Sequence, residues 1–216
     1  MRQKIIYLGA VIALNAHSFF TMPDWQPDTW DRLASMAMRD FSGIEPYSFT
    51  VFVLFGMFSL LLASLMLLDG RYQRLPVWPF ALSMMALGPS MVFLYLAFRK
   101  DRGYAVRPNN ALEDVAQSKW LPIVIAAISI GALWDGRSGN FDQLWQLFQT
   151  DYLTHAMLVD EALFVLLTPV LVAQDCRRRG RGAGWIWAAL LVPLFGACAY
   201  LATRRHQPDA SAAKPG

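Results

Sequence analysis

Six long stretches of the sequence contain no Asp, Glu, Lys or Arg. They cover residues 5–23, 46–68, 75–98, 120–134, 162–174 and 182–203. A helix needs roughly 20 apolar residues to cross about 30 Å of hydrocarbon, and three of these stretches exceed that length. Composition agrees, because 56% of the residues are hydrophobic, 16% are charged and the mean hydropathy is +0.33. The sequence predicts an all-α, polytopic transmembrane bundle of about six helices, and it excludes a secreted disulfide scaffold and a disordered chain.

The charged residues and the cysteines exclude further classes. Basic residues gather beside apolar stretches, at 99–102 and 177–181, where guanidinium groups suit lipid phosphates. No basic face with interleaved aromatic residues surrounds them, so we expect a lipid bilayer and no nucleic acid as the partner. Cys176 and Cys198 lack metal-ligand spacing, and the sequence indicates neither a metal site nor a cofactor.

Two matching motifs indicate an internal duplication. The sequence YLAFR at 95–99 ends one apolar stretch and YLATR at 200–204 ends the last, and an Asp-x-Arg turn precedes each, at Asp69 and Asp175. We predict two three-helix repeats, 1–102 and 120–206, joined by a linker over 103–119 and followed by a disordered tail over 207–216. A three-helix unit crosses the membrane an odd number of times, so the second repeat would be inverted relative to the first.

Parts of this topology stay open. Lys and Arg divide almost evenly between the two sides of a six-span chain, which sets no orientation. The stretch 120–134 is short, and is either a full crossing or a tilted or re-entrant helix. The N-terminal apolar stretch resembles an export signal. It has a counterpart in the second repeat, at 120–134, and this favours a helix that is not cleaved off. Residues 28–40 and 140–151 have the apolar spacing of helices that lie in the membrane interface.

An acidic pair is the most informative polar feature. The stretch 162–174 is too short to span, so its helix must begin about ten residues earlier and carry Asp160 and Glu161 below the head groups. Ionisable groups at that depth are costly and indicate a functional site. Adjacent residues lie about 100° apart on a helix, so we expect one carboxylate to face the interior and the other an arginine or the interface. Asp151 and His155, four residues apart, share a helix face, and the carboxylate can orient the imidazole.

Other interpretations of the acidic pair stay open. The helix can begin late and expose both carboxylates in its first turn, or the acids can form a structural ion pair. Function is favoured because the equivalent positions of the first repeat are Leu54 and Phe55. The ligand-binding candidates are Asn15, His17, Asp151, His155, Asp160 and Glu161, and the catalytic candidates among them are Asp160, Glu161 and His155.

Three further polar or helix-breaking features complete the set of candidates. A lone histidine such as His17 more often forms a local hydrogen bond than binds a ligand. With His155 it can form a metal or proton-transfer site, but no HxxH spacing supports a metal. The pairs at 88–89 and 168–169, each with a proline, are expected to kink their helices and open a small cavity between the hairpins.

The half-repeat resembles a family of small, uncharacterised three-helix bacterial membrane proteins, with an Asp in the second helix and a Leu-Tyr-Leu-Arg-type motif closing the third. Asp160 and residues 200–204 match in the second copy, and 95–99 match in the first, which lacks the Asp. The segment 158–164 is also similar to the three-helix subunits of heterodimeric carotenoid cyclases, whose helix carries Pro-x-Glu-Glu followed by aromatics. Here that proline is missing. The first likeness implies a membrane protein without assigned activity, and the second implies isoprenoid chemistry.

From these features we expect a non-enzymatic, multi-pass protein of the bacterial inner membrane. It would bind a lipid-like molecule, such as an isoprenoid, or another membrane protein between its two halves. The alternative is an isoprenoid-lipid enzyme of the cyclase or isomerase type. In that enzyme Asp160 or Glu161 is an intramembrane general acid, and the other carboxylate or His155 tunes it. A buried carboxylate beside a lipid-sized pocket would favour the enzyme, because a binding or scaffolding role requires neither.

Overall fold

The structure is a computed structural model that describes residues 2–38, 44–100 and 111–204, and their regular secondary structure is helical. The helices in chain order are α1 (Arg2–Phe20), α2 (Thr29–Met38), α3 (Pro46–Gly70), α4 (Trp78–Leu87), α5 (Ser90–Phe98), α6 (Ala111–Gln117), α7 (Trp120–Gly136), α8 (Phe141–Thr150), α9 (Tyr152–Arg179), α10 (Gly184–Leu191) and α11 (Pro193–Thr203). The all-α fold class is therefore confirmed for this part of the chain.

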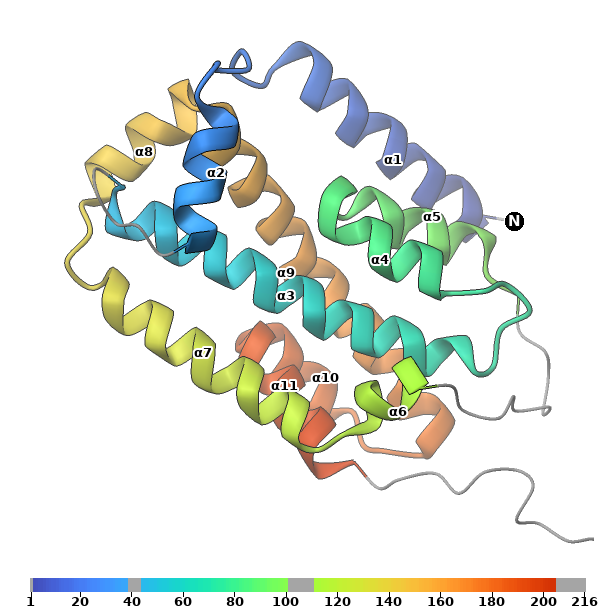
Figure 1. The fold of residues 1–216 in the computed structure, drawn as a ribbon. Helices are drawn as coiled ribbons and strands as arrows, with labels where there is room; N and C mark the ends of the chain where they lie inside the picture. Colours follow the sequence, from blue (N-terminus) through green and yellow to red (C-terminus); the bar gives the residue numbers. More distant parts are fainter. Residues whose placement is uncertain (1, 39–43, 101–110, 205–216) are drawn as a thin grey trace, which may run out of the picture.

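The two longest helices, α3 and α9, pack against each other through the middle of the molecule (Figure 1). Each begins at an acidic cap, because the Glu45 and Asp151 carboxylates accept backbone N–H groups of the first turn. α9 ends at Gly180, whose φ of 62° is a conformation that favours glycine. Apolar side chains of both helices, including Leu61 and Phe164, are fully buried in the main core.

α4 and α5 form a hairpin. Gly88, with φ of 59°, ends α4, and the chain then turns back. The rings of Phe80 and Tyr95, near the start of α4 and the end of α5, have centroids 6.0 Å apart. The N–H of Arg74 donates to the carbonyl of Lys100 over 3.0 Å. The hairpin therefore begins and ends at the same end of the molecule (Figure 1).

α10 and α11 form a second hairpin in the corresponding position. The chain bends at Val192, and Pro193 begins α11, where its missing N–H costs no helical hydrogen bond. A Cβ at Gly196 would collide with the α10 backbone, so only glycine permits this close approach. Trp185 and Tyr200, early in α10 and late in α11, have ring centroids 5.7 Å apart.

The predicted six-span topology is not confirmed. Among the described residues, α3 and α9 are long and apolar enough to cross a bilayer, and α6 with α7, bent by 62°, can make a third span. The hairpin helices have 8 to 11 residues each, about half a bilayer at 1.5 Å per residue. Because both hairpins return to their starting end, each half passes between the ends an even number of times. This differs from the inverted arrangement that three crossings per half would give.

The two halves repeat one packing pattern. α1 lies along α5 in the first half, and α7 lies along α11 in the second. Tyr95 donates a hydrogen bond to Asp69, and Tyr200 donates one to Asp175. Arg99 and Arg204 of the two closing motifs are salt-bridged to the same two carboxylates, at 3.5 and 3.9 Å. Matched contacts of this kind are expected of a duplication, which stays a prediction.

The remaining segments differ in how well they match expectation. The linker predicted over 103–119 contains α6, which packs on α3, while 103–110 and the predicted tail over 207–216 lie outside the described residues. α2 and α8 form as predicted. The Gly88 break is observed, but Pro169 lies inside a continuous α9, where the Thr168 hydroxyl donates to the Phe164 carbonyl over 2.7 Å.

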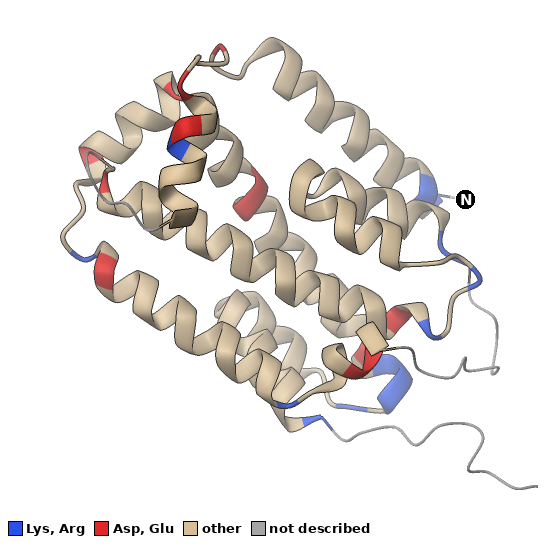
Figure 2. Cartoon of the chain, in the orientation of Figure 1, with Lys and Arg blue, Asp and Glu red and all other residues tan. Residues whose placement is uncertain are grey.

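Basic residues gather at the end of the molecule where α3 and α9 finish, which we call the basic end (Figure 2). They are Arg2, Lys4, Arg71, Arg74, Arg99, Lys100, Lys119, Arg177, Arg178, Arg179, Arg181 and Arg204. Of the described Lys and Arg, only Arg32 and Arg137 lie at the opposite end. There Trp25 packs on both Trp30 and Tyr152, and we call this the aromatic end. The even division of charge expected from six spans is therefore not observed among the described residues, because the hairpins bring their basic ends back to one end of the molecule.

Candidate functional site

The sequence-predicted pair of Asp151 and His155 does not interact through its side chains. Asp151 accepts the N–H of Thr154 over 2.8 Å and forms an ion pair with Arg32 of α2. Its carboxylate, 4% exposed, is therefore a helix cap and an interhelical contact. A backbone carbonyl, that of Phe148, orients the imidazole instead. The prediction that Asp151 orients His155 is wrong, because the capping position turns the carboxylate toward the backbone and α2.

His155 instead meets His17 of α1. Their Nε2 atoms lie 3.1 Å apart, and their ring centroids are 5.2 Å apart. The Nδ1 of His155 donates to the Phe148 carbonyl over 2.7 Å, and the Phe148 ring stacks on the imidazole at 4.4 Å. The Nδ1 of His17 contacts the Thr21 hydroxyl. The structure thus unites two candidates that are 138 residues apart in the sequence.

Asn15, the other candidate in α1, is not part of this group. Its side-chain amide donates to the Val11 carbonyl over 2.8 Å, one turn back along the same helix, and the contact is exposed. The Asn15 side chain is therefore hydrogen-bonded within its own helix and not to the two histidines.

Asp160 and Glu161 lie well inside α9, which begins at Tyr152, so the exposed-first-turn interpretation does not apply. Both residues are half-buried. The Asp160 carboxylate lies against Gly88, at the break between α4 and α5. The Oε1 atom of Glu161 is buried and has no hydrogen-bond partner among the described residues. Neither acid therefore forms the structural ion pair that the sequence left open, as far as the described residues extend.

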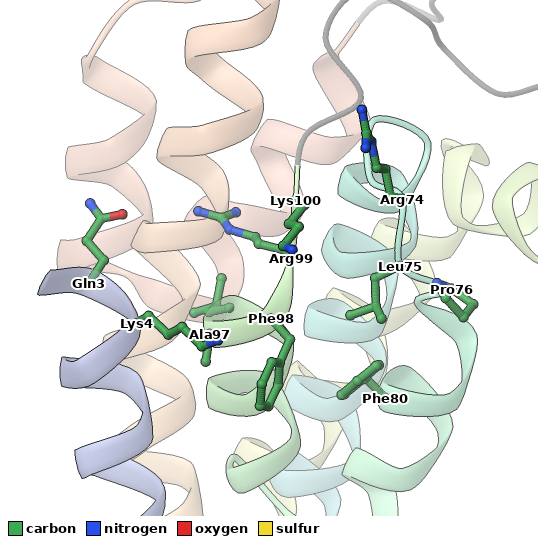
Figure 3. A pocket seen from close by; sticks show the side chains of 11 residues that line it. Gln3, Lys4, Arg74, Leu75, Pro76, Phe80, Ala97, Phe98, Arg99 and Lys100 are labelled. Atoms are coloured by element: carbon green, nitrogen blue, oxygen red, sulfur yellow. The ribbon is translucent and has the colours of Figure 1, made fainter. Parts of the chain in front are cut away.

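A pocket of about 890 Å³ lies at the basic end, between the start of α1, the turn before α4 and the end of α5 (Figure 3). Its apolar side includes Leu75, Pro76, Phe80, Leu96 and Phe98, and its cations are Lys4, Arg74, Arg99 and Lys100. Among the described residues, none of those that line it is acidic. Such a combination of an apolar wall and clustered cations suits an amphiphile with a negative head group.

The cations of the pocket are held in different ways. Arg99 is salt-bridged to Asp69 over 3.5 Å and donates to the Gln174 side chain. The Lys4 ammonium lies 4.9 Å from the centroid of the Phe98 ring. Arg74 and Lys100 are exposed. Arg99 is therefore fixed by the fold, whereas Arg74 and Lys100 have their charges at the surface of the pocket.

Sequence reasoning assigned two of these cations, Arg99 and Lys100, to membrane anchoring and missed the pocket. The available signal was the placement of basic residues on both sides of the 75–98 stretch. It becomes informative only once that stretch is known to fold back on itself.

A second pocket of about 460 Å³ lies where the two halves meet, at the start of α3 and the end of α7. Its lining is Ile44, Pro46, Phe49, Trp134, Asp135, Arg137 and Ser138. The lining carries one acid and one cation, so it has no net preference for a charged ligand.

No protein-family model, no curated protein and no solved structure matches the chain. The resemblances to three-helix membrane proteins and to carotenoid cyclase subunits therefore stay expectations.

Proposed function

We propose that the protein is a multi-pass membrane protein that binds an anionic lipid in the pocket at its basic end. The observation that supports this most directly is the placement of Lys4, Arg74, Arg99 and Lys100 around the apolar wall formed by Phe80 and neighbours. Guanidinium and ammonium groups donate strong, charge-assisted hydrogen bonds to phosphate. The apolar wall suits the first part of an acyl or isoprenoid chain.

The size of the pocket is consistent with a lipid head group. Its volume of about 890 Å³ falls within the range of roughly 300 to 1,000 Å³ that is usual for small-ligand sites. The pocket belongs to the first half alone, so the ligand would not sit between the halves as the sequence suggested. A phospholipid and an isoprenoid phosphate share the chemistry that this site recognises.

The charge distribution favours one orientation. Membrane proteins carry an excess of Lys and Arg on the cytoplasmic side. We therefore propose that the basic end faces the cytoplasm of a bacterial inner membrane and that the aromatic end lies at the outer interface. The cytoplasmic leaflet would then supply the anionic lipid directly to the pocket.

The enzyme alternative uses Asp160 and Glu161 as proton donors. The buried, unpartnered Oε1 of Glu161 favours it, because such a carboxyl is costly to keep charged. Against it, neither acid lines the two pockets described above. Replacing both acids, by Asp160→Asn and Glu161→Gln, tests it, since unchanged membrane lipid composition in cells carrying the double variant would contradict an enzymatic role.

Lipid binding to the purified protein tests the main proposal. The protein in a neutral detergent is mixed with phosphatidylglycerol or phosphatidylcholine, and bound lipid is counted by native mass spectrometry. We expect phosphatidylglycerol to be retained in preference, and the double variant Arg74→Gln, Lys100→Gln to lose at least about tenfold in affinity, because two phosphate donors are removed. A long-chain isoprenoid phosphate in place of phosphatidylglycerol distinguishes the two lipid sources.

A matched control is available at the same end of the molecule. Lys119 and Arg177 are exposed and do not line the pocket. Lys119→Gln with Arg177→Gln makes the same change in net charge, and we expect it to retain lipid binding. Equal loss in both double variants would show attraction by net charge alone and would overturn the proposed site.

A further inference from the structure

The hydrogen bond to a backbone carbonyl fixes the state of the His155 ring. A carbonyl can only accept, so the contact of 2.7 Å between the Nδ1 of His155 and the Phe148 carbonyl requires the proton on Nδ1. In a neutral imidazole the Nε2 atom then carries a lone pair.

His17 is held by Thr21. The Thr21 hydroxyl contacts both the Nδ1 and the backbone carbonyl of His17, the latter over 2.8 Å. When the hydroxyl donates to the carbonyl, its oxygen accepts from the Nδ1–H of His17, and the Nε2 of His17 then carries a lone pair as well.

The two Nε2 atoms face each other over 3.1 Å. At this distance the two nitrogen atoms share either a proton or a larger cation, because two lone pairs alone would repel. Metal-bound histidines typically donate the other ring N–H to a backbone carbonyl or a similar acceptor, which is the arrangement of His155 here. Two imidazoles on one tetrahedral zinc, with Zn–N of 2.0 to 2.1 Å, have their nitrogen atoms about 3.3 Å apart, close to the observed separation.

We propose that His17 and His155 bind a divalent first-row transition ion of the zinc type, which bridges α1 and α9. This site is separate from the lipid pocket, because the histidines lie at the aromatic end and the pocket at the basic end. His155 is 7% exposed, whereas His17 is half-buried, so water can complete the coordination on the α1 side.

The chain supplies two ligands to this ion. No group of three or more His, Cys, Asp or Glu residues is placed to hold a metal among the described residues. The bridge would have a structural effect, because α1 contains no fully buried residue and packs mainly along α5. An ion shared with α9 would hold the last turn of α1 in place.

Binding of Co²⁺, a spectroscopic substitute for Zn²⁺, tests the proposal. Protein purified without a histidine tag and stripped with a chelator is titrated with Co²⁺, and the visible absorption of the bound ion is recorded. We expect one ion per chain, and at least about tenfold weaker binding in His17→Ala and in His155→Ala, since each leaves one protein ligand. Zn²⁺ should raise the unfolding temperature of the wild type and of neither variant.

The third histidine of the chain, His206, provides the control. His206→Ala should bind Co²⁺ like the wild type, and His17→Cys should retain binding through a thiolate, with a new sulfur-to-cobalt absorption band. Circular dichroism of each variant checks that the helices are intact. The proposal is overturned if the wild type binds no Co²⁺ and nitrogen NMR shows one protonated ring, because the pair then shares a proton. It is also overturned if His206→Ala abolishes binding while His17→Ala does not.

Discussion

The hydroxyl of Tyr200 donates a hydrogen bond to the carboxylate of Asp175 over 2.6 Å and joins the end of α11 to the end of α9. Tyr200 is fully buried, and Arg179 and Arg204 are salt-bridged to the same carboxylate at 2.9 and 3.9 Å. Burial lowers the pKa of the Arg204 guanidinium to about 10, which leaves it charged at neutral pH. The second hairpin is therefore closed by a buried polar cluster at the basic end, in which the Asp175 carboxylate is held by a tyrosine and two arginines.

Removal of the Tyr200 hydroxyl should weaken this closure. Tyr200→Phe leaves one lone pair of the Asp175 carboxylate without its donor, and we expect a loss of about 1 to 3 kcal/mol in the free energy of unfolding. Urea or mild-denaturant unfolding in micelles, followed by circular dichroism, measures it. Tyr7→Phe is the control, because Tyr7 is only half-buried and lies on α1, and it should change stability by less than about 0.5 kcal/mol.

The break between α4 and α5 should tolerate no side chain. Gly88 has φ of 59°, and a Cβ there would collide with the Asp160 carboxylate. Gly180 has a similar φ of 62° but open space around its Cβ position. We expect Gly180→Ala to cost about 1 to 2 kcal/mol from the backbone alone, and Gly88→Ala to cost clearly more.

A second substitution separates the collision from the backbone effect. Thermal unfolding of Gly88→Ala with Asp160→Ala should recover the part of the loss that the collision causes, because the smaller side chain leaves space. The strain from the ψ of −153° at Gly88, against 28° at Gly180, should remain. Equal stability of Gly88→Ala and Gly180→Ala would contradict the close contact between Asp160 and the break.

The Asp151 carboxylate should contribute separately as a cap and as an ion-pair partner. Asp151→Asn keeps a side-chain oxygen that can accept the Thr154 N–H but removes the charge opposite Arg32, so we expect a loss below about 1 kcal/mol. Asp151→Ala removes both and should cost about 1 kcal/mol more. Chemical unfolding of both variants measures the difference. Equal losses in the two variants would mean that the cap contributes nothing.

Apolar patterning was sufficient to predict helices and their approximate positions, including α2 and α8. It was not sufficient to predict how the helices turn. The stretch 75–98 is long enough for one span, and only the positive φ of Gly88 and the contact between Arg74 and Lys100 reveal a hairpin. Hydropathy averages over such a break, because the residues on both sides of it are apolar.

The candidate residues were only partly predictable for a similar reason. The position of Asp160 and Glu161 inside α9, and not in its first turn, followed from the length that a span requires. The pairing of His17 with His155 did not, since it depends on α1 lying antiparallel to α5 and crossing the start of α9. The Asp151 cap was indicated locally, because an Asp immediately before a helix is typical of an N-cap.

Accessibility of two engineered cysteines distinguishes the hairpin from a span. In a chain with Cys176 and Cys198 replaced by alanine, Arg74→Cys and Lys100→Cys flank the α4–α5 hairpin, and the two backbones are hydrogen-bonded over 3.0 Å. We expect both to react with a membrane-impermeant thiol reagent from the same, cytoplasmic side. Ser138→Cys, at the end of α7, should react from the opposite side. Labelling of positions 74 and 100 from opposite sides would restore the six-span topology and contradict the hairpin, because a crossing helix must separate them.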